Sequence, residues 1–429
     1  MKILLVSSEL AEAAAVGGVA EYVLGLAAAL LRAGHDVRVA LPAYGFVAQR
    51  EGLRVTHERL VTRLGLGMSA VTSARELTLG VPGEGDLRLP VTLLCDHPHF
   101  ASCRAPRDVY SWPNHEPWIA FSRAVVDWLD ASDWQPDAIH CQDAHTALVP
   151  IYVKLLRLER NAGWAARART VLTIHNLLNQ GLGEPGLVSY AGLPWSLFSL
   201  EGFEFFGQAN CFKAGLLYAD KVNTVSRTYA REISSDPNYG FGLEGVLKSL
   251  YDTGRLAGVV NGIDEARWGL DGLAYDRSLA DADRALALKA EARARLYERW
   301  QCKPDRPLIA LRGRWDRQKG VELFAECIEW IGEVANVALV TWGCQGALPG
   351  LRHAWDKLND YARQYPGRVM INPEGIAEQS QLATHYLAAD LFLMPSVYEP
   401  CGLAQMECQR YGAIPIVRRT GGLADTVIE

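Results

Sequence analysis

Short apolar runs alternate with segments of helical periodicity along most of the chain. Ile3–Ser7 has the continuous apolar character of a buried strand. A helix follows Gly17-Gly18, because apolar residues then recur every three or four positions, at Val19, Val23, Leu26 and Leu30. Gly34 ends that helix, and the same order recurs, with strands expected at Val37–Leu41, Ala138–Cys141, Val171–His175 and Val222–Val225. This alternation predicts an α/β fold with a parallel sheet covered by helices on both faces.

A second series of the same kind begins after a turn signal at Asn261-Gly262. Its first helix is expected at Asp281–Arg299, and its strands at Pro307–Arg314, Val337–Trp342, Val369–Asn372, Leu391–Pro395 and Ile414–Arg418. We therefore expect two domains, residues 1–258 and 259–429. The stretch Gly65–Asp96 is rich in strand signals and predicts a hairpin insertion in the first domain. Gly421-Gly422 should begin a helix close to Glu429, so we expect the second domain to be incomplete, with further sequence following.

Composition excludes several classes of function. The 429 residues are 49% hydrophobic and carry a net charge of -6, whereas a general nucleic-acid binder is usually basic. No apolar run approaches the roughly 18 residues that cross a bilayer, so no membrane partner is expected. The nine cysteines include no CxxC pair, which favours reduced thiols in the cytoplasm over disulfides or a zinc site.

Two cations follow the first strand of the second series. Arg314 and Lys319 lie where ligands of open α/β folds bind, at the carboxyl end of a parallel strand. Helix N-termini and cations at such an edge neutralise anions such as diphosphates. The alternative, with about equal weight, is a solvated basic loop.

Glu399-Pro400-Cys401-Gly402-Leu403 follows another strand of that series. Gly402 permits close approach of the backbone to a ligand at a helix start. Glu399 precedes the helix and Glu407 lies about one turn inside it, so both carboxylates can face a sugar. The alternative is a helix N-terminus with acids favoured by the helix dipole.

Other candidates lie in the first series. Gly17-Gly18, at a strand-to-helix turn, can bring backbone amides to a phosphate, and His175 ends a strand. His140, Asp143 and His145 suggest metal ligands, but the two histidines belong to a strand and to the next helix, so no metal site is expected. The GxGxxG pattern of Gly240–Gly245 lacks a preceding strand, and we interpret it as accidental.

In their shared order, these motifs resemble the bacterial glycogen synthases and plant starch synthases, which are retaining glycosyltransferases of the GT-B fold. The resemblance runs nearly from end to end. It is carried by Lys2–Glu9 with Gly17-Gly18, His140–Pro150, Thr173–Leu177, Lys213–Gly215, Asn261–Asp264, Gln318–Gly320, Glu399–Leu403 and Thr420–Val427.

The resemblance implies two Rossmann-like domains facing a cleft. It implies transfer of glucose from ADP-glucose, or another nucleotide sugar, to the non-reducing end of an α-1,4-glucan such as glycogen, without a required metal or other cofactor. By position, Arg314 and Lys319 would hold the diphosphate, while His175 and Glu399 would meet the glucose. The remaining donor-side residues would be Gly17, Gly18, Asn261, Cys401, Gly402, Leu403, Thr420 and Gly421. Those lining the cleft on the acceptor side would be Asp143, His145 and Glu407.

The chain departs from the family at several of these positions. Where the family has Lys-x-Gly-Gly for the donor diphosphate, this chain has Ala15. The family's tryptophan is replaced by Ala144, and its arginine before Glu-Pro-Cys-Gly-Leu by Val397. The segment Pro373–Gln381 lacks the tyrosine that usually meets the adenine, although Tyr386 is nearby, and the C-terminal helix that packs on the first domain is missing.

Two interpretations follow from these departures. The first, favoured about two to one, is a transferase with altered donor or acceptor preference, because Arg314, Lys319, His175 and Glu399 are retained. The second is a weak or inactive relative that binds glucan or regulates a partner, which Ala15 favours.

Overall fold

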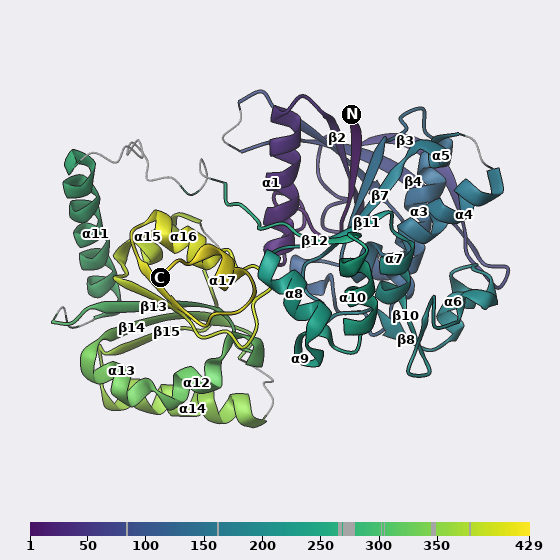
Figure 1. Ribbon diagram of the computed structural model, residues 1–429. Helices are drawn as coiled ribbons and strands as arrows, with labels where there is room; N and C mark the ends of the chain where they lie inside the picture. Colours follow the sequence, from purple (N-terminus) through teal and green to yellow (C-terminus); the bar gives the residue numbers. More distant parts are fainter. Residues whose placement is uncertain are drawn as a thin grey trace. The chain divides into compact units, whose positions relative to one another are not determined.

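The computed structural model describes residues 1–82, 85–160, 163–264, 268, 279–301, 303, 305–344, 349–376 and 379–429. The chain divides into two compact units (Figure 1), one of Met1–Val225 with Ala230–Val259 and one of Ser226–Tyr229 with Val260–Glu429. This division falls one residue after the boundary expected at 258/259. It also assigns a short piece of helix α8 (Arg227–Ser235) to the second unit, where Asp425 accepts backbone N–H bonds from Arg227 and Thr228.

The first unit is built on a nine-stranded sheet in the order β12-β11-β7-β6-β1-β2-β5-β4-β3. Its parallel part consists of β1 (Lys2–Val6), β2 (Asp36–Pro42), β5 (Arg88–Leu94), β6 (Ala138–Gln142), β7 (Arg169–Ile174), β11 (Lys221–Thr224) and β12 (Leu256–Gly258). The longer helices of this unit are α1 (Gly18–Arg32), α3 (Glu116–Ala131), α4 (Leu148–Arg160), α7 (Cys211–Tyr218) and α10 (Glu244–Asp252). The strands expected in this unit are therefore present, because their apolar runs fill the buried centre of the sheet.

The strand-rich stretch contains the expected antiparallel hairpin, and this hairpin is part of the main sheet. β3 (Arg54–Arg63) and β4 (Ser69–Gly80) pair antiparallel, and β4 pairs antiparallel with β5, which is parallel to β2. Strands β3 and β4 thus extend the main sheet to an open edge. The β3–β4 pairing shifts register twice, between Val55 and His57 and between His57 and Leu60.

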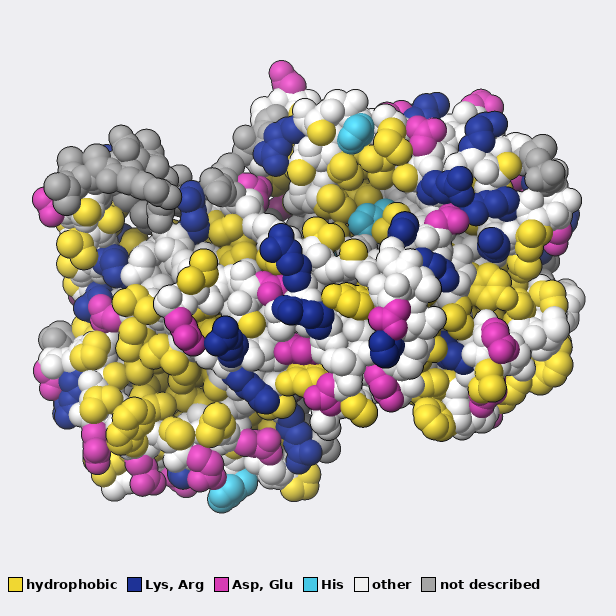
Figure 2. All heavy atoms as spheres, in the orientation of Figure 1, with side chains coloured by type: hydrophobic (Ala, Val, Ile, Leu, Met, Phe, Trp, Pro, Cys, Tyr) yellow, Lys and Arg dark blue, Asp and Glu magenta, His cyan; other side chains and the backbone are white. Residues whose placement is uncertain are grey.

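A small antiparallel sheet lies outside the main one, with β10 (Gln208–Asn210) between β8 (Leu182–Gly183) and β9 (Glu204–Phe205). Figure 2 shows hydrophobic side chains gathered over the region of this sheet and α6 (Gly186–Tyr190). The exposed hydrophobic residues of this segment of the chain are Leu182, Trp195, Leu200 and Phe206, of which Phe206 is 84% exposed. The apolar character of this segment therefore belongs in part to the surface.

The second unit has a five-stranded parallel sheet in the order β15-β14-β13-β16-β17. Its strands are β13 (Leu308–Arg314), β14 (Asn336–Trp342), β15 (Val369–Asn372), β16 (Leu391–Met394) and β17 (Ile414–Val417). The direction of strand order reverses beside β13, between β14 and β16. This is the topological switch point at which open α/β sheets bind ligands.

Alternate residues of β13 pack on the two faces of this sheet. Ile309 and Leu311 join a core with α12 (Val321–Glu326), α13 (Ile328–Val334) and α14 (Pro349–Gln364). Leu308 and Ala310 join cores with α11 (Leu279–Trp300), α15 (Gln379–Ala388) and α16 (Ala404–Arg410). Figure 1 shows α12–α14 on one side of the strands and α15 and α16 on the other. Both units therefore have the layered α/β architecture that the sequence predicts. No helix among the described residues is both long and apolar enough to cross a membrane.

Candidate functional site

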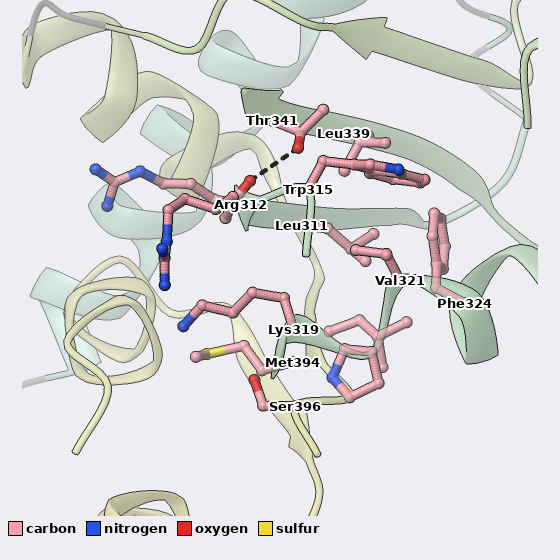
Figure 3. Close-up of a pocket in the computed structure, with 14 residues that line it drawn as sticks. Leu311, Arg312, Trp315, Lys319, Val321, Phe324, Leu339, Thr341, Met394 and Ser396 are labelled. Atoms are coloured by element: carbon pink, nitrogen blue, oxygen red, sulfur yellow. Dashed lines mark hydrogen bonds between the residues drawn. The ribbon is translucent and has the colours of Figure 1, made fainter. Parts of the chain in front are cut away.

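The second unit gathers cations at the carboxyl end of β13. Arg312, Arg314 and Lys319 line one pocket with Met394, the last residue of β16, and with Ser396, which follows that strand. Figure 3 shows Lys319 between the strand end that carries Arg312 and the segment of Met394 and Ser396. The pocket therefore lies at the switch point of the sheet and has the charge that an anionic ligand requires.

The turn after β13 is shaped by two local features. Asp316 caps the short helix Arg317–Lys319, its side chain accepting from the Lys319 backbone N–H at 3.1 Å. Gly320 has a φ of +67°, and a Cβ there would lie 2.0 Å from the Pro395 carbonyl oxygen. Only glycine fits this close approach, which brings Lys319 against the β16 segment.

Each pocket cation has a carboxylate partner in the protein. Lys319 Nζ lies 2.7 Å from Glu399 Oε2, which also accepts from the Ser396 hydroxyl at 2.9 Å. Arg314 Nη2 lies 3.2 Å from Asp316 Oδ2. Glu399 is only 5% exposed, so its partner Lys319 is held in one place. The structure thus joins two predicted site residues, Lys319 and Glu399, by a direct ion pair.

The Glu399–Leu403 segment packs on the start of α17 (Gly421–Thr426). A Cβ on Gly421 would lie 1.9 Å from the Glu399 carbonyl oxygen, and one on Gly422 would lie 2.3 Å from Cys401. The Cys401 thiol contacts the Asn261 backbone, and burial raises its pKa to about 12. Gly402 has a φ of +73°, as expected for a glycine at a close turn. The predicted residues around Thr420, Asn261 and Cys401 therefore lie together in this unit.

Glu407 differs from its expected place. Glu407 is 3% exposed, and its carboxylate accepts from the Tyr386 hydroxyl at 2.8 Å and lies 3.4 Å from Arg312 Nη1. Glu407 is thus a buried partner of Arg312 rather than a carboxylate facing a sugar alongside Glu399. Tyr386 is fully buried, so its ring offers no surface to a nucleobase. Residues 377 and 378 of the segment Pro373–Gln381 lie outside the described residues.

In the first unit, Asp143 connects the ends of β6 and β7. Asp143 has a φ of +55°, unusual for a residue with a side chain, and its Oδ1 accepts the His175 backbone N–H at 2.7 Å. Burial raises the pKa of Asp143 to about 7. A residue that holds a strained backbone to orient a neighbouring strand end is typical of a functional site.

His175 is oriented by two side chains. Its Nε2 donates to Gln142 Oε1 at 2.8 Å, and its ring meets the Tyr22 ring edge-on, with centroids 4.6 Å apart. Burial, and to a smaller degree His140, lower the pKa of His175 to about 3. The imidazole is therefore neutral at physiological pH and can act as a hydrogen-bonding group with a fixed direction.

His145 is placed apart from that network. Its ring lies among aromatic rings, with centroids 4.8 Å from Tyr110 and 4.6 Å from Trp118, and burial lowers its pKa to about 3. Among the described residues, no three His, Cys, Asp or Glu side chains gather in a way that could hold a metal ion.

The Gly17-Gly18 turn is held by a residue that sequence reasoning did not select. Glu9, 3% exposed, accepts backbone N–H bonds from Val16 at 2.9 Å and from Gly17 at 2.6 Å. The Gly17 amide expected to meet a phosphate is thus already bonded to a carboxylate. Sequence reasoning also missed Arg312. Its position two residues before Arg314 places both arginines on the same face of the strand, and this spacing could have identified it.

The positions that depart from the family differ in exposure. Ala15 and Val397 are exposed, whereas Ala144 is 1% exposed and its carbonyl accepts from His115 Nε2 at 2.9 Å. Longer side chains are therefore accommodated at Ala15 and Val397 without disturbing a core.

Comparison with known proteins covers nearly the whole chain. Residues 2–249 match the family model of the starch synthase catalytic domain, and residues 293–429 match that of the glycosyl transferases group 1. Glycogen synthase 2 of Geobacter sulfurreducens is 38% identical over 449 residues, and the glycogen synthase of Thermotoga maritima is 35% identical over 438 residues; each match covers all of this chain and 85% of the relative.

Solved structures agree with the sequence relatives. The catalytic domain of starch synthase IV from Arabidopsis thaliana, a structure bound to ADP and acarbose, is similar with a TM-score of 0.81 and 28% identity, over 100% of this chain and 84% of that one. Sucrose-phosphate synthase from Thermosynechococcus elongatus shares the fold, with a TM-score of 0.57 and 19% identity over 100% of this chain and 83% of that one. With two matched family models and relatives above 30% identity that match all of this chain, the chain belongs to the glycogen and starch synthase family of glycosyltransferases.

Proposed function

We propose that this protein transfers glucosyl units from ADP-glucose to the non-reducing end of an α-1,4-glucan, with retention of configuration. The observation that supports it best is the cationic pocket at the switch point of the second unit, within a chain of this family. The relative whose structure contains ADP and acarbose supports a nucleotide donor and a glucan acceptor for this chain as well.

The reaction requires that the diphosphate leave with its charge neutralised. Arg314 and Lys319 supply that neutralisation, since a charged donor beside a developing anion stabilises the transition state. The bond from the glucose C1 to the phosphate oxygen breaks, the acceptor hydroxyl oxygen bonds to C1, and its proton passes to the departing diphosphate on the same face. Glu399, fixed by Lys319 and Ser396, and the backbone of Cys401–Leu403 hold the glucose hydroxyls.

The residues of the first unit act on the sugar side. A neutral His175 with a fixed ring direction suits hydrogen bonding to a glucose hydroxyl near C1, and Asp143 keeps the strand end that carries it in position. We expect no metal requirement, because side-chain cations meet the diphosphate charge, and activity should persist in EDTA.

The test is release of nucleoside diphosphate from ADP-, UDP- and GDP-glucose in the presence of glycogen. Release with ADP-glucose, together with lengthening of the glucan, is the expected result. Release only with UDP-glucose or GDP-glucose would show that this nucleotide sugar, and not ADP-glucose, is the donor. If the protein binds glycogen but releases no nucleoside diphosphate from any donor, the proposed enzymatic activity is wrong and a glucan-binding role is favoured.

A further inference from the structure

We propose that Arg312 is a third cation for the donor diphosphate, held in place by Glu407 and Tyr386. This inference rests on the proposed function, since it names a further residue of the same donor site.

The position of Arg312 follows from the register of β13. Leu308 and Ala310 pack toward α11, α15 and α16, and Arg312 is the next residue on that face. It lies at the carboxyl end of the strand, where the apolar layer ends, and it lines the pocket with Arg314 and Lys319 (Figure 3). An arginine in a strand of this kind would otherwise be expected on the surface, because burying a guanidinium among apolar side chains is costly.

Glu407 and Tyr386 form the anchor that keeps Arg312 there. Arg312 Nη1 lies 3.1 Å from the Tyr386 hydroxyl and 3.4 Å from Glu407 Oε2. The same Oε2 accepts from Tyr386 at 2.8 Å. Both anchors come from helices that pack on this face, Tyr386 from α15 and Glu407 from α16. Because both anchor side chains are buried, their contacts with the Arg312 guanidinium restrict its conformational freedom.

The same arrangement leaves Arg312 suited to a phosphate. A guanidinium carries five N–H donors in a planar fork, so it can keep one carboxylate and bind a phosphate oxygen as well. The pocket pairs Arg312 with Glu407, as it pairs Lys319 with Glu399 and Arg314 with Asp316. Before a diphosphate binds, the three cations are already directed by carboxylates, so the N–H donors are preorganised and their charges are balanced.

The experiment measures the binding of nucleoside diphosphates by calorimetry, with no catalytic step. ADP, UDP and GDP are titrated into the full chain, and the tightest binder is then titrated into variants. Arg312→Gln alone would leave Glu407 buried without its cation, so the main variant is the double substitution Arg312→Gln with Glu407→Gln, which removes both charges. The control is Arg352→Gln, which removes an equal charge from an exposed position on α14.

We expect the double variant to bind the diphosphate about 10- to 100-fold more weakly, the range of one charged hydrogen bond. The matching nucleoside monophosphate should lose less, and Arg312→Lys should recover part of the loss. Glu407→Gln should weaken binding on its own but add little once Arg312 is Gln, since it acts through Arg312. A purely structural role for Glu407 would instead lower the unfolding temperature and leave the diphosphate affinity unchanged.

Two other outcomes separate the hypotheses. If Lys319→Gln weakens binding but the folded double variant binds as the wild type does, Arg312 is not a phosphate ligand, and the proposed function stands. If the wild type binds none of the three diphosphates, the proposed function fails and this inference fails with it.

Discussion

The two units place their polar residues at equivalent points of their sheets, yet they build opposite environments. In the first unit, Glu9 and Asp143 accept backbone N–H bonds, and His175 is kept neutral by burial. In the second unit, the polar groups are charged pairs such as Lys319 with Glu399. The first arrangement fixes the orientation of neutral hydrogen-bonding groups, and the second holds cations in place beside carboxylates. A glycosyl transfer needs both, because the sugar must be held and the diphosphate must be neutralised.

The largest effect is expected when a charge is removed from the second unit, which tests whether charge is what distinguishes this unit from the first. Lys319→Gln should lower kcat/KM for nucleotide-sugar turnover by about 100- to 1,000-fold, since the proposed function places this charged donor beside the leaving diphosphate. The measurement is steady-state release of nucleoside diphosphate. Lys357→Gln, which breaks another lysine–glutamate pair of the same unit, serves as the control and should leave turnover within a factor of about two. Similar losses in both variants would mean that Lys319 acts through general stability.

Removing the oriented side chain of His175 from the first unit should lower turnover less than the loss of Lys319 does. His175→Gln should lower kcat by about 10- to 100-fold, with little change in nucleoside diphosphate affinity, because the proposed function places His175 at the sugar and not at the phosphates. His57→Gln, at the edge strand β3, provides a histidine control.

The neutrality of His175 is also testable. Because burial lowers its pKa to about 3, His175 does not titrate between about pH 5 and 8. The wild-type profile of kcat over that range should therefore show no step that disappears in His175→Gln. A step near pH 6.5 that vanishes in the variant would show that the imidazole is charged in part of the range.

Adding a charge to the first unit should sharpen the comparison. Ala15 is exposed, so Ala15→Lys restores the family's cation without disturbing packing. We expect nucleoside diphosphate affinity to rise by about 10-fold, the lower end of a charged hydrogen bond. Val16→Lys places the same charge next to it and should do less. Equal gains from both would indicate a general electrostatic effect rather than a specific contact.

The smallest effect concerns the protonation of Asp143. Burial raises its pKa to about 7 from the ordinary value of 3.8. Between those values the folded protein binds more protons than the unfolded chain, so this carboxyl lowers the stability of the fold as pH rises from about 4 to 7. Asp143→Asn keeps an acceptor oxygen and removes the titration, so its stability relative to the wild type should increase over that window.

Urea unfolding of both proteins across the pH range measures this difference. Asp137→Asn is the matched control, since Asp137 also accepts a backbone N–H bond, from Lys2. A difference between Asp143→Asn and wild type that stays constant with pH would mean that the Asp143 carboxyl does not titrate in this window.

Much of the fold could be predicted because it depends on local pattern. The strands of both units lie where buried apolar runs were found, since a parallel strand covered on both faces needs such a run. Asn261-Gly262 marked the change of unit because a turn signal between two periodic series is local information. The hairpin of the strand-rich stretch was predicted from local pattern, but its place in the main sheet was not, because the pairing of β5 with β2 joins segments far apart in sequence.

The candidate site was harder, because contacts decide it. Lys319 and Glu399 were selected from separate motifs, and only the fold pairs them. Glu9 and Arg312 were missed because their roles depend on what they touch: the Gly17 amide in one case, and Tyr386 with Glu407 in the other. The φ of Asp143 was likewise out of reach, since no residue pattern requires an aspartate to adopt it.

The open edge of the first unit has a consequence for the protein in solution. Strand β3 pairs with β4 on one side only among the described residues, so its other side offers backbone groups to any other extended chain. Strand β3 counters this with its two register shifts and with exposed charged residues, namely Arg54, Glu58, Arg59 and Arg63. Irregular spacing and charge make a poor template for another strand. The register shifts and charges of β3 therefore protect the folded protein from aggregation through sheet extension. Substitutions that remove the register shifts or the charges are expected to lower its solubility.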